Sequence, residues 1–103
     1  MATNTDRVKL KNSKGLQVKL LSAVVATGAG SAFSPTMEKQ TFQVNGISTA
    51  TVKIQVTNDL SNWEDSGLQF TADGIGSISG MFKAVRANVT AWSSGATTVT
   101  GVI

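Results

Sequence analysis

Residues 49–57, TATVKIQVT, alternate between apolar and polar side chains along their whole length. Val52, Ile54 and Val56 fall on one side of an extended chain, and the polar residues fall on the other. In a helix these three apolar residues would not share one face, because a helix repeats every 3.6 residues. The pattern therefore predicts a β-strand with one buried face and one solvated face.

The same alternation, with interruptions, recurs in three other segments: residues 16–25, 38–44 and 85–90. In the first, the phase slips at Leu21, which predicts one long, bent strand. The second ends at Asn45-Gly46, a dipeptide that favours a tight hairpin turn, so we expect a hairpin into residues 47–57. A further turn is expected at residues 73–76, DGIG, and the C-terminal TTVTGVI is expected to be a strand.

Together these signals predict the fold class. A chain of 103 residues forms one core, and no window has the apolar spacing of a helix. Roughly six to eight short strands separated by Gly- and Ser-rich turns predict an all-β, antiparallel β-sandwich of jelly-roll or immunoglobulin-like type. We expect a single domain over residues 1–103. Its buried face is expected to include Val52, Ile54, Val56, Val85, Ala87 and Val89.

The chain lacks the residues on which most enzyme sites depend. It has no Cys and no His, so thiolate and imidazole ligands and the usual nucleophile–base pairs are absent. Most of the carboxylates fall in predicted turns, where they would be solvated, and their spacing does not match a calcium loop. We therefore expect no catalytic, cofactor-binding or metal-binding residues and no enzyme activity. The apolar run Leu20–Ala26 is also too short to cross a membrane, which takes about 20 residues.

Positive charge is concentrated in an N-terminal basic segment, residues 1–15. The first nineteen residues contain five cations against Asp6. Val8 and Leu10 alternate with these cations, which would line one side of an edge strand. Lysines there would prevent strand-to-strand aggregation or dock on an acidic protein. Nucleic acid is not expected, because no aromatic residues are interleaved. The candidates for partner contact are Arg7, Lys9, Lys11 and Lys14.

Two tryptophans are further candidates for partner contact. Trp63 follows the polar run TNDLSN, whose Asn and Asp side chains predict a tight turn, and Trp92 lies in a later strand. Each indole can lie across the rim of the sheet with its N–H near water. Alternatively, the indole of Trp63 is a flat platform for a sugar, with the flanking Asn and Asp side chains bonding to the sugar hydroxyls. Trp92 offers the same alternative, and two indoles on one edge would favour it.

The segment Ala50–Thr100 resembles small virion structural proteins of tailed bacteriophages, of the head decoration and head fibre type. The resemblance is carried by ATVKIQVTNDLSNWED, TADGIGSISG, FKAVRANVTAW and TTVT, in that order. The turn before Trp63 is also similar to turns in discoidin-like and carbohydrate-binding sandwiches. Leu60 stands where those turns often have Gly, which argues against the same loop conformation here.

The resemblance implies a capsid decoration or cementing protein on the particle surface, acting as a homo-oligomer, such as a trimer, against the major capsid protein or another virion protein. The contacts would come from the N-terminal basic segment or from the strand over residues 97–103. The alternatives are a tail or neck accessory protein, which shares the fold, and a module that binds host glycans through Trp63 and Trp92.

Overall fold

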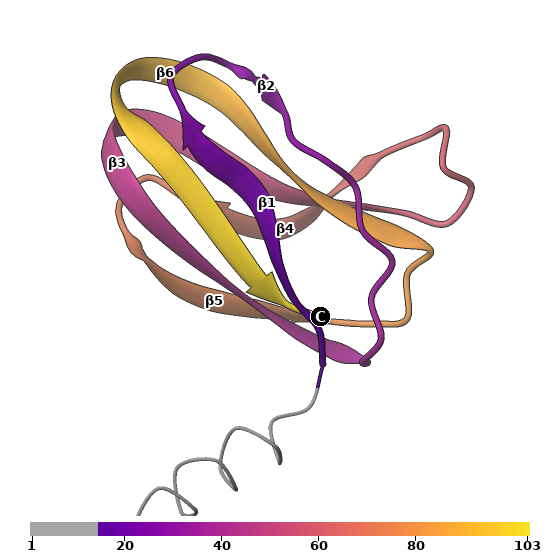
Figure 1. Cartoon of the computed structure of the whole chain (residues 1–103). Helices are drawn as coiled ribbons and strands as arrows, with labels where there is room; N and C mark the ends of the chain where they lie inside the picture. Colours follow the sequence, from indigo (N-terminus) through magenta and orange to yellow (C-terminus); the bar gives the residue numbers. More distant parts are fainter. Residues whose placement is uncertain (1–14) are drawn as a thin grey trace, which may run out of the picture.

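The computed structural model describes residues 15–103 of the chain. The basic candidates Arg7, Lys9, Lys11 and Lys14 lie outside the described residues. All regular structure in residues 15–103 is β-strand (Figure 1). The strands are β1 (Gln17–Val24), β2 (Gly28–Ala29), β3 (Lys39–Thr57), β4 (Glu64–Phe70), β5 (Gly74–Ser79) and β6 (Ala84–Val102). They form one antiparallel sheet, so the all-β, antiparallel prediction is confirmed.

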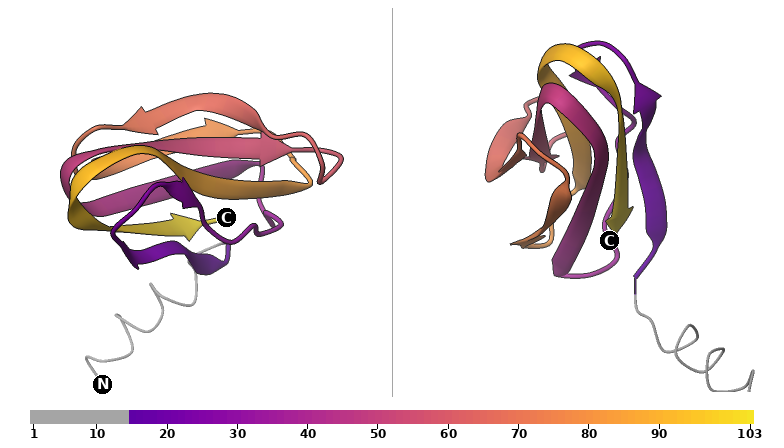
Figure 2. Two further views of the ribbon diagram at one scale, coloured as in Figure 1. Left: turned by 90° about the horizontal axis from the view of Figure 1, so that it is seen from above. Right: turned by 90° about the vertical axis from the view of Figure 1, so that its left-hand side faces the viewer.

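Two long strands, β3 and β6, form the centre of the sheet, each with 19 residues. The first half of β3 pairs with β5 and with the last part of β6, where Val44 lies opposite Val99. The second half of β3 pairs with β4 and with the first part of β6, where Val52 lies opposite Val89. Because both strands bend midway, the sheet folds over on itself and its two halves face each other (Figure 2).

Register shifts and two glycines allow this bend. Four irregularities in the β3–β6 pairing fall between Asn45 and Val52. Gly46 (φ 84°) and Gly95 (φ 103°) have positive φ angles there, which L-residues with side chains rarely adopt. The hairpin predicted at Asn45-Gly46 is wrong, since β3 continues through it. The dipeptide supplies the expected backbone geometry, but in a bent strand instead of a turn.

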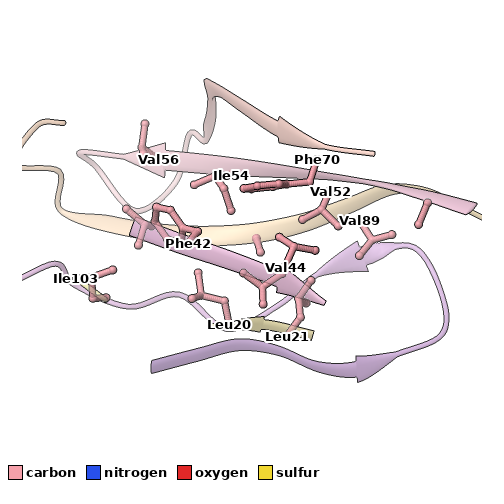
Figure 3. Close-up of a cluster of buried hydrophobic side chains, with 14 residues drawn as sticks. Leu20, Leu21, Phe42, Val44, Val52, Ile54, Val56, Phe70, Val89 and Ile103 are labelled. Carbon is pink, nitrogen blue, oxygen red and sulfur yellow. The ribbon is translucent and has the colours of Figure 1, made fainter. Parts of the chain in front are cut away.

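The core lies between the two halves of the folded sheet. Phe42 and Val44 point from one half toward Val52 and Ile54 of the other (Figure 3). All six residues predicted for the buried face are buried. The remaining apolar members of the cluster are Leu20, Leu21, Ala50, Phe70, Val99 and Ile103.

The two ends of the described chain lie side by side. Gln17 of β1 pairs with Val102 of β6, and the Ile103 N–H donates to the Leu16 carbonyl over 2.9 Å. The predicted phase slip at Leu21 is confirmed, because the β1–β6 register shifts on both sides of it. The last part of β6 lies between β1 and β3, and Ile103 is fully buried. The C-terminal strand is therefore interior to the sheet, with Thr98, Thr100 and Val102 partly exposed on one face, and its role in lateral contacts stays a prediction.

Candidate functional site

The polar run before Trp63 forms a tight turn, as predicted, and its side chains bond to one another. The Thr57 hydroxyl donates to the Asn62 carbonyl over 2.6 Å and accepts from the Leu60 N–H over 3.1 Å. The Asp59 carboxylate accepts from the backbone N–H groups of Ser61 and Asn62 at 2.9 and 2.8 Å. The amide of Asn62 donates to the second oxygen of Asp59 over 2.9 Å.

These hydrogen bonds determine the electrostatics of the turn. The backbone N–H of Asn62, then its side-chain amide and the Ser61 N–H, hold the pKa of Asp59 well below its usual range. Each bond favours the charged carboxylate, so Asp59 stays ionised and serves the turn. In residues 15–103 no three carboxylate, His or Cys side chains gather as a metal site would require, and no helix is long and apolar enough to span a membrane.

Leu60 has a backbone conformation that normally favours glycine. Its φ angle is +65°, in the left-handed region, and its side chain is 56% exposed. Sequence reasoning expected that a Leu at this position would prevent the glycine-type turn. The structure places Leu60 in the left-handed region nevertheless, because the hydrogen bonds around Thr57 and Asp59 fix the turn.

Trp63 belongs to a group of bonded side chains on the outer face of the sheet. The Arg86 guanidinium carbon lies 4.3 Å from the centre of the Trp63 indole, a cation–π contact. Arg86 also donates to the Gln55 side chain over 2.9 Å, and Gln55 donates to Asp65 over 2.9 Å. Lys53 and Asp65 form an ion pair at 3.5 Å. The Gln55 bond, with help from the Lys53 charge, lowers the pKa of Asp65.

This outer-face network leaves little for a sugar to bind at Trp63. Arg86 covers one face of the indole. Gln55, which bonds to Arg86, and Asp65 already bond to each other. The network therefore fixes the side chains of strands β3, β4 and β6 on this face.

Trp92 has a structural role at the bend. Thr51 pairs with Ala91 and Val52 with Val89, so Thr90 is an extra residue in β6, a β-bulge. After the bulge Trp92 packs against the core, and its indole N–H donates to the Gly95 carbonyl over 2.8 Å.

The two tryptophans do not share one edge. Trp92 lies opposite Ala50, whereas the Arg86 that stacks on Trp63 lies opposite Gln55, five positions further along β3. At about 3.3 Å per residue this is a separation of roughly 16 Å. The structure therefore does not bring Trp63 and Trp92 together as one platform.

A groove that sequence reasoning missed runs between β4 and β5. It is lined by Val56, Asp65, Ser66, Gly67, Leu68, Ser77, Ile78, Ser79 and Phe82. A second hollow adjoins it, shares Val56 and Phe82, and extends to Asp59 and Glu64. We call these two hollows together the β4–β5 groove.

The turn predicted at residues 73–76 is wrong in part, because Gly74–Ser79 forms strand β5. Its two glycines mask the strand pattern. A Cβ at Gly76 would lie 2.6 Å from the end of the Leu68 side chain of β4, so a larger residue there would require Leu68 to move. The sequence signal for this strand is that Gly74–Ser79 is an uncharged run with two isoleucines between turn residues.

Comparison with known proteins gives one structural likeness. No family model and no curated protein sequence matches the chain. The structure is similar to the crystal structure of the SPBc2 prophage-derived protein YomS, with a TM-score of 0.74 and 14% sequence identity. The match covers 86% of this chain and 91% of that one. At this identity the likeness shows a shared fold.

Proposed function

We propose that this chain is a non-enzymatic structural protein of a bacteriophage particle, located on the head surface, where it decorates or cements the capsid through protein–protein contacts. The observation that carries the proposal is the fold shared with a prophage-derived protein over 86% of the chain. The resemblance of residues 50–100 to virion proteins of tailed phages supports it independently. We further assign the folded-over sheet to the sandwich class seen in such proteins.

The surface of the described residues suits adhesion. The polar side chains around Trp63 are engaged with one another and hold the outer face of the sheet rigid. The β4–β5 groove instead offers apolar side chains between two strand edges, the kind of surface that binds another protein chain. Ile75 and Met81 are also exposed apolar side chains, at 72% and 63%.

Labelling of particles tests the proposal. Antibodies against the chain, detected with gold in the electron microscope, should decorate the heads of phage particles produced by a host that carries the gene. Particles with the gene deleted are the control. Label on tails would favour the tail or neck role, and purified particles without label and without the chain would refute a virion role.

We do not propose the glycan-binding alternative. Two tryptophans on one edge would have favoured it, but Trp92 and the Arg86 that stacks on Trp63 lie roughly 16 Å apart along the sheet. Trp92 also uses its N–H within the bend.

A further inference from the structure

The β4–β5 groove has two unpaired strand edges. In the described residues, β4 and β5 each pair along one side with β3, and their other sides face the groove. β5 contains no charged residue and no Pro, although such residues usually protect an exposed edge from pairing with another chain. The edge of β5 is therefore open to an added strand.

The groove is apolar at its base and acidic beside it. Four of its lining residues are partly or largely buried apolar side chains: Val56, Leu68, Ile78 and Phe82. Asp59, Glu64 and Asp65 lie along it or at its end. Among residues 15–103 the one ion pair joins Lys53 to Asp65, so no ion pair there neutralises Asp59 or Glu64. An added strand should have apolar side chains on one face and cations on the other.

The chain itself contains such a segment. Residues 7–11, RVKLK, alternate three cations with Val8 and Leu10. Residues 15–103 have five cations and five anions, a net charge of zero, so the whole +3 lies in residues 1–14, with four cations against Asp6. Charge complementarity therefore selects this segment as the occupant of the groove.

The position of Gly15 indicates which copy supplies the segment. β1 and β5 lie on opposite edges of the row β1–β6–β3–β5, about 14 Å apart at three strand spacings, and the groove lies beyond β5. The four Cα-to-Cα steps from Gly15 to Lys11 span at most about 14 Å when fully extended. A copy cannot place its whole RVKLK segment along its own groove.

We propose that residues 7–11 of one copy add as a β-strand to the free edge of β5 in a second copy, with Val8 and Leu10 on the apolar base and the cations toward the carboxylates. Main-chain hydrogen bonds supply affinity, and the alternate side chains supply specificity. This contact rests on the proposed function and adds to it how copies of the chain would associate with one another. Its test needs no phage particle, so the two proposals can fail separately.

Engineered cysteines test the contact directly, because the chain has none of its own. A Lys9→Cys copy, mass-labelled with nitrogen-15, is mixed with an unlabelled Ser77→Cys copy and oxidised mildly, because Ser77 lies on the face of β5 opposite to Ile78 and so on the same face as Lys9 of the added strand. We expect a mixed disulfide dimer as the main product. The control partner is Ala26→Cys, also exposed but in the β1–β2 loop, away from the groove. Equal cross-linking to both partners would refute the proposal.

The double variant K9C/S77C, oxidised at low concentration, tests whether the segment occupies the groove of its own copy instead. A cross-link confined to single chains would show that the segment binds its own groove and would overturn the exchange between copies. Wild-type chain that stays monomeric in sedimentation at every concentration would overturn it as well.

A charge swap tests the electrostatic part. We expect Lys9→Glu/Lys11→Glu to weaken association at least tenfold, and Glu64→Lys to weaken it in the same direction. Circular dichroism checks that both are folded. When the two variants are mixed, the acidic segment of the first meets the basic groove of the second, and the basic segment of the second meets the acidic groove of the first. Association should therefore recover. Failure of the mixture to associate more than either variant alone would contradict the proposed pairing.

Discussion

At the scale of single residues, Leu60 shows how a hydrogen-bonded turn overrides local preference. The composition TNDLSN predicts the turn, because Asn and Asp favour such backbone geometry. It does not predict the positive φ of Leu60, because that angle results from several bonds made together by Thr57 and Asp59.

Leu60→Gly should therefore stabilise the protein. A left-handed conformation costs a residue with a Cβ about 1–2 kcal/mol, and Gly loses roughly 0.5–1 kcal/mol in chain entropy. With an exposed side chain, we expect the free energy of unfolding to rise by up to about 1 kcal/mol, measured by urea denaturation. Leu16→Gly, also at an exposed Leu but without a positive φ, is the control and should not stabilise. A lower stability for Leu60→Gly would show that the Leu60 side chain makes a contact of its own.

Asp59 predicts a pH dependence. Its pKa is lower in the folded chain than in the unfolded chain, so its contribution is complete above the unfolded value, near 4. This contribution is lost as the pH falls toward the folded value. Asp59→Ala should be less stable than wild type at pH 7, and the difference should shrink between pH 5 and pH 2 in thermal unfolding scans. A difference that is independent of pH would assign the effect to something other than this charge.

At the scale of elements, residue patterns in the sequence identify strands better than they identify which strands pair with each other. The alternation in residues 49–57 predicts both the strand and its buried face, since these depend on local period alone. Which strand lies beside which depends on pairing between distant positions, as between Val44 and Val99, 55 positions apart. For that reason the sequence does not place the end of β6 between β1 and β3 and gives no sign of the β4–β5 groove.

Gly46 in the bend should be more sensitive to substitution than glycines elsewhere in the sheet. A Cβ at Gly46 would overlap the Ala96 carbonyl, and Gly46 has a positive φ. Gly67 has a positive φ but open space, and Gly74 has open space without a positive φ. We expect Gly46→Ala to cost about 2–4 kcal/mol, Gly67→Ala about 1 kcal/mol and Gly74→Ala less than that, in denaturant unfolding. Equal costs at all three positions would contradict the bend geometry.

At the scale of the whole molecule, β3 and β6 make the two halves of the sheet one cooperative unit, because each runs through both halves. Val52→Ala and Val99→Ala, one in each half and both at fully buried residues, should each lower the free energy of unfolding by about 2 kcal/mol. Tryptophan fluorescence and far-ultraviolet circular dichroism should report the same single transition in both variants. Two separated transitions in either variant would show that the halves unfold independently.

The continuity of β3 and β6 also determines how the chain could be divided. A cut in the exposed Thr71–Asp73 connection would leave β3 in one fragment and β6 in the other. Each fragment would then contain only one residue of every β3–β6 pair, and neither fragment could bury its valines alone. The two pieces would have to meet to fold, which makes this protein a natural starting point for a split reporter whose signal depends on fragment complementation.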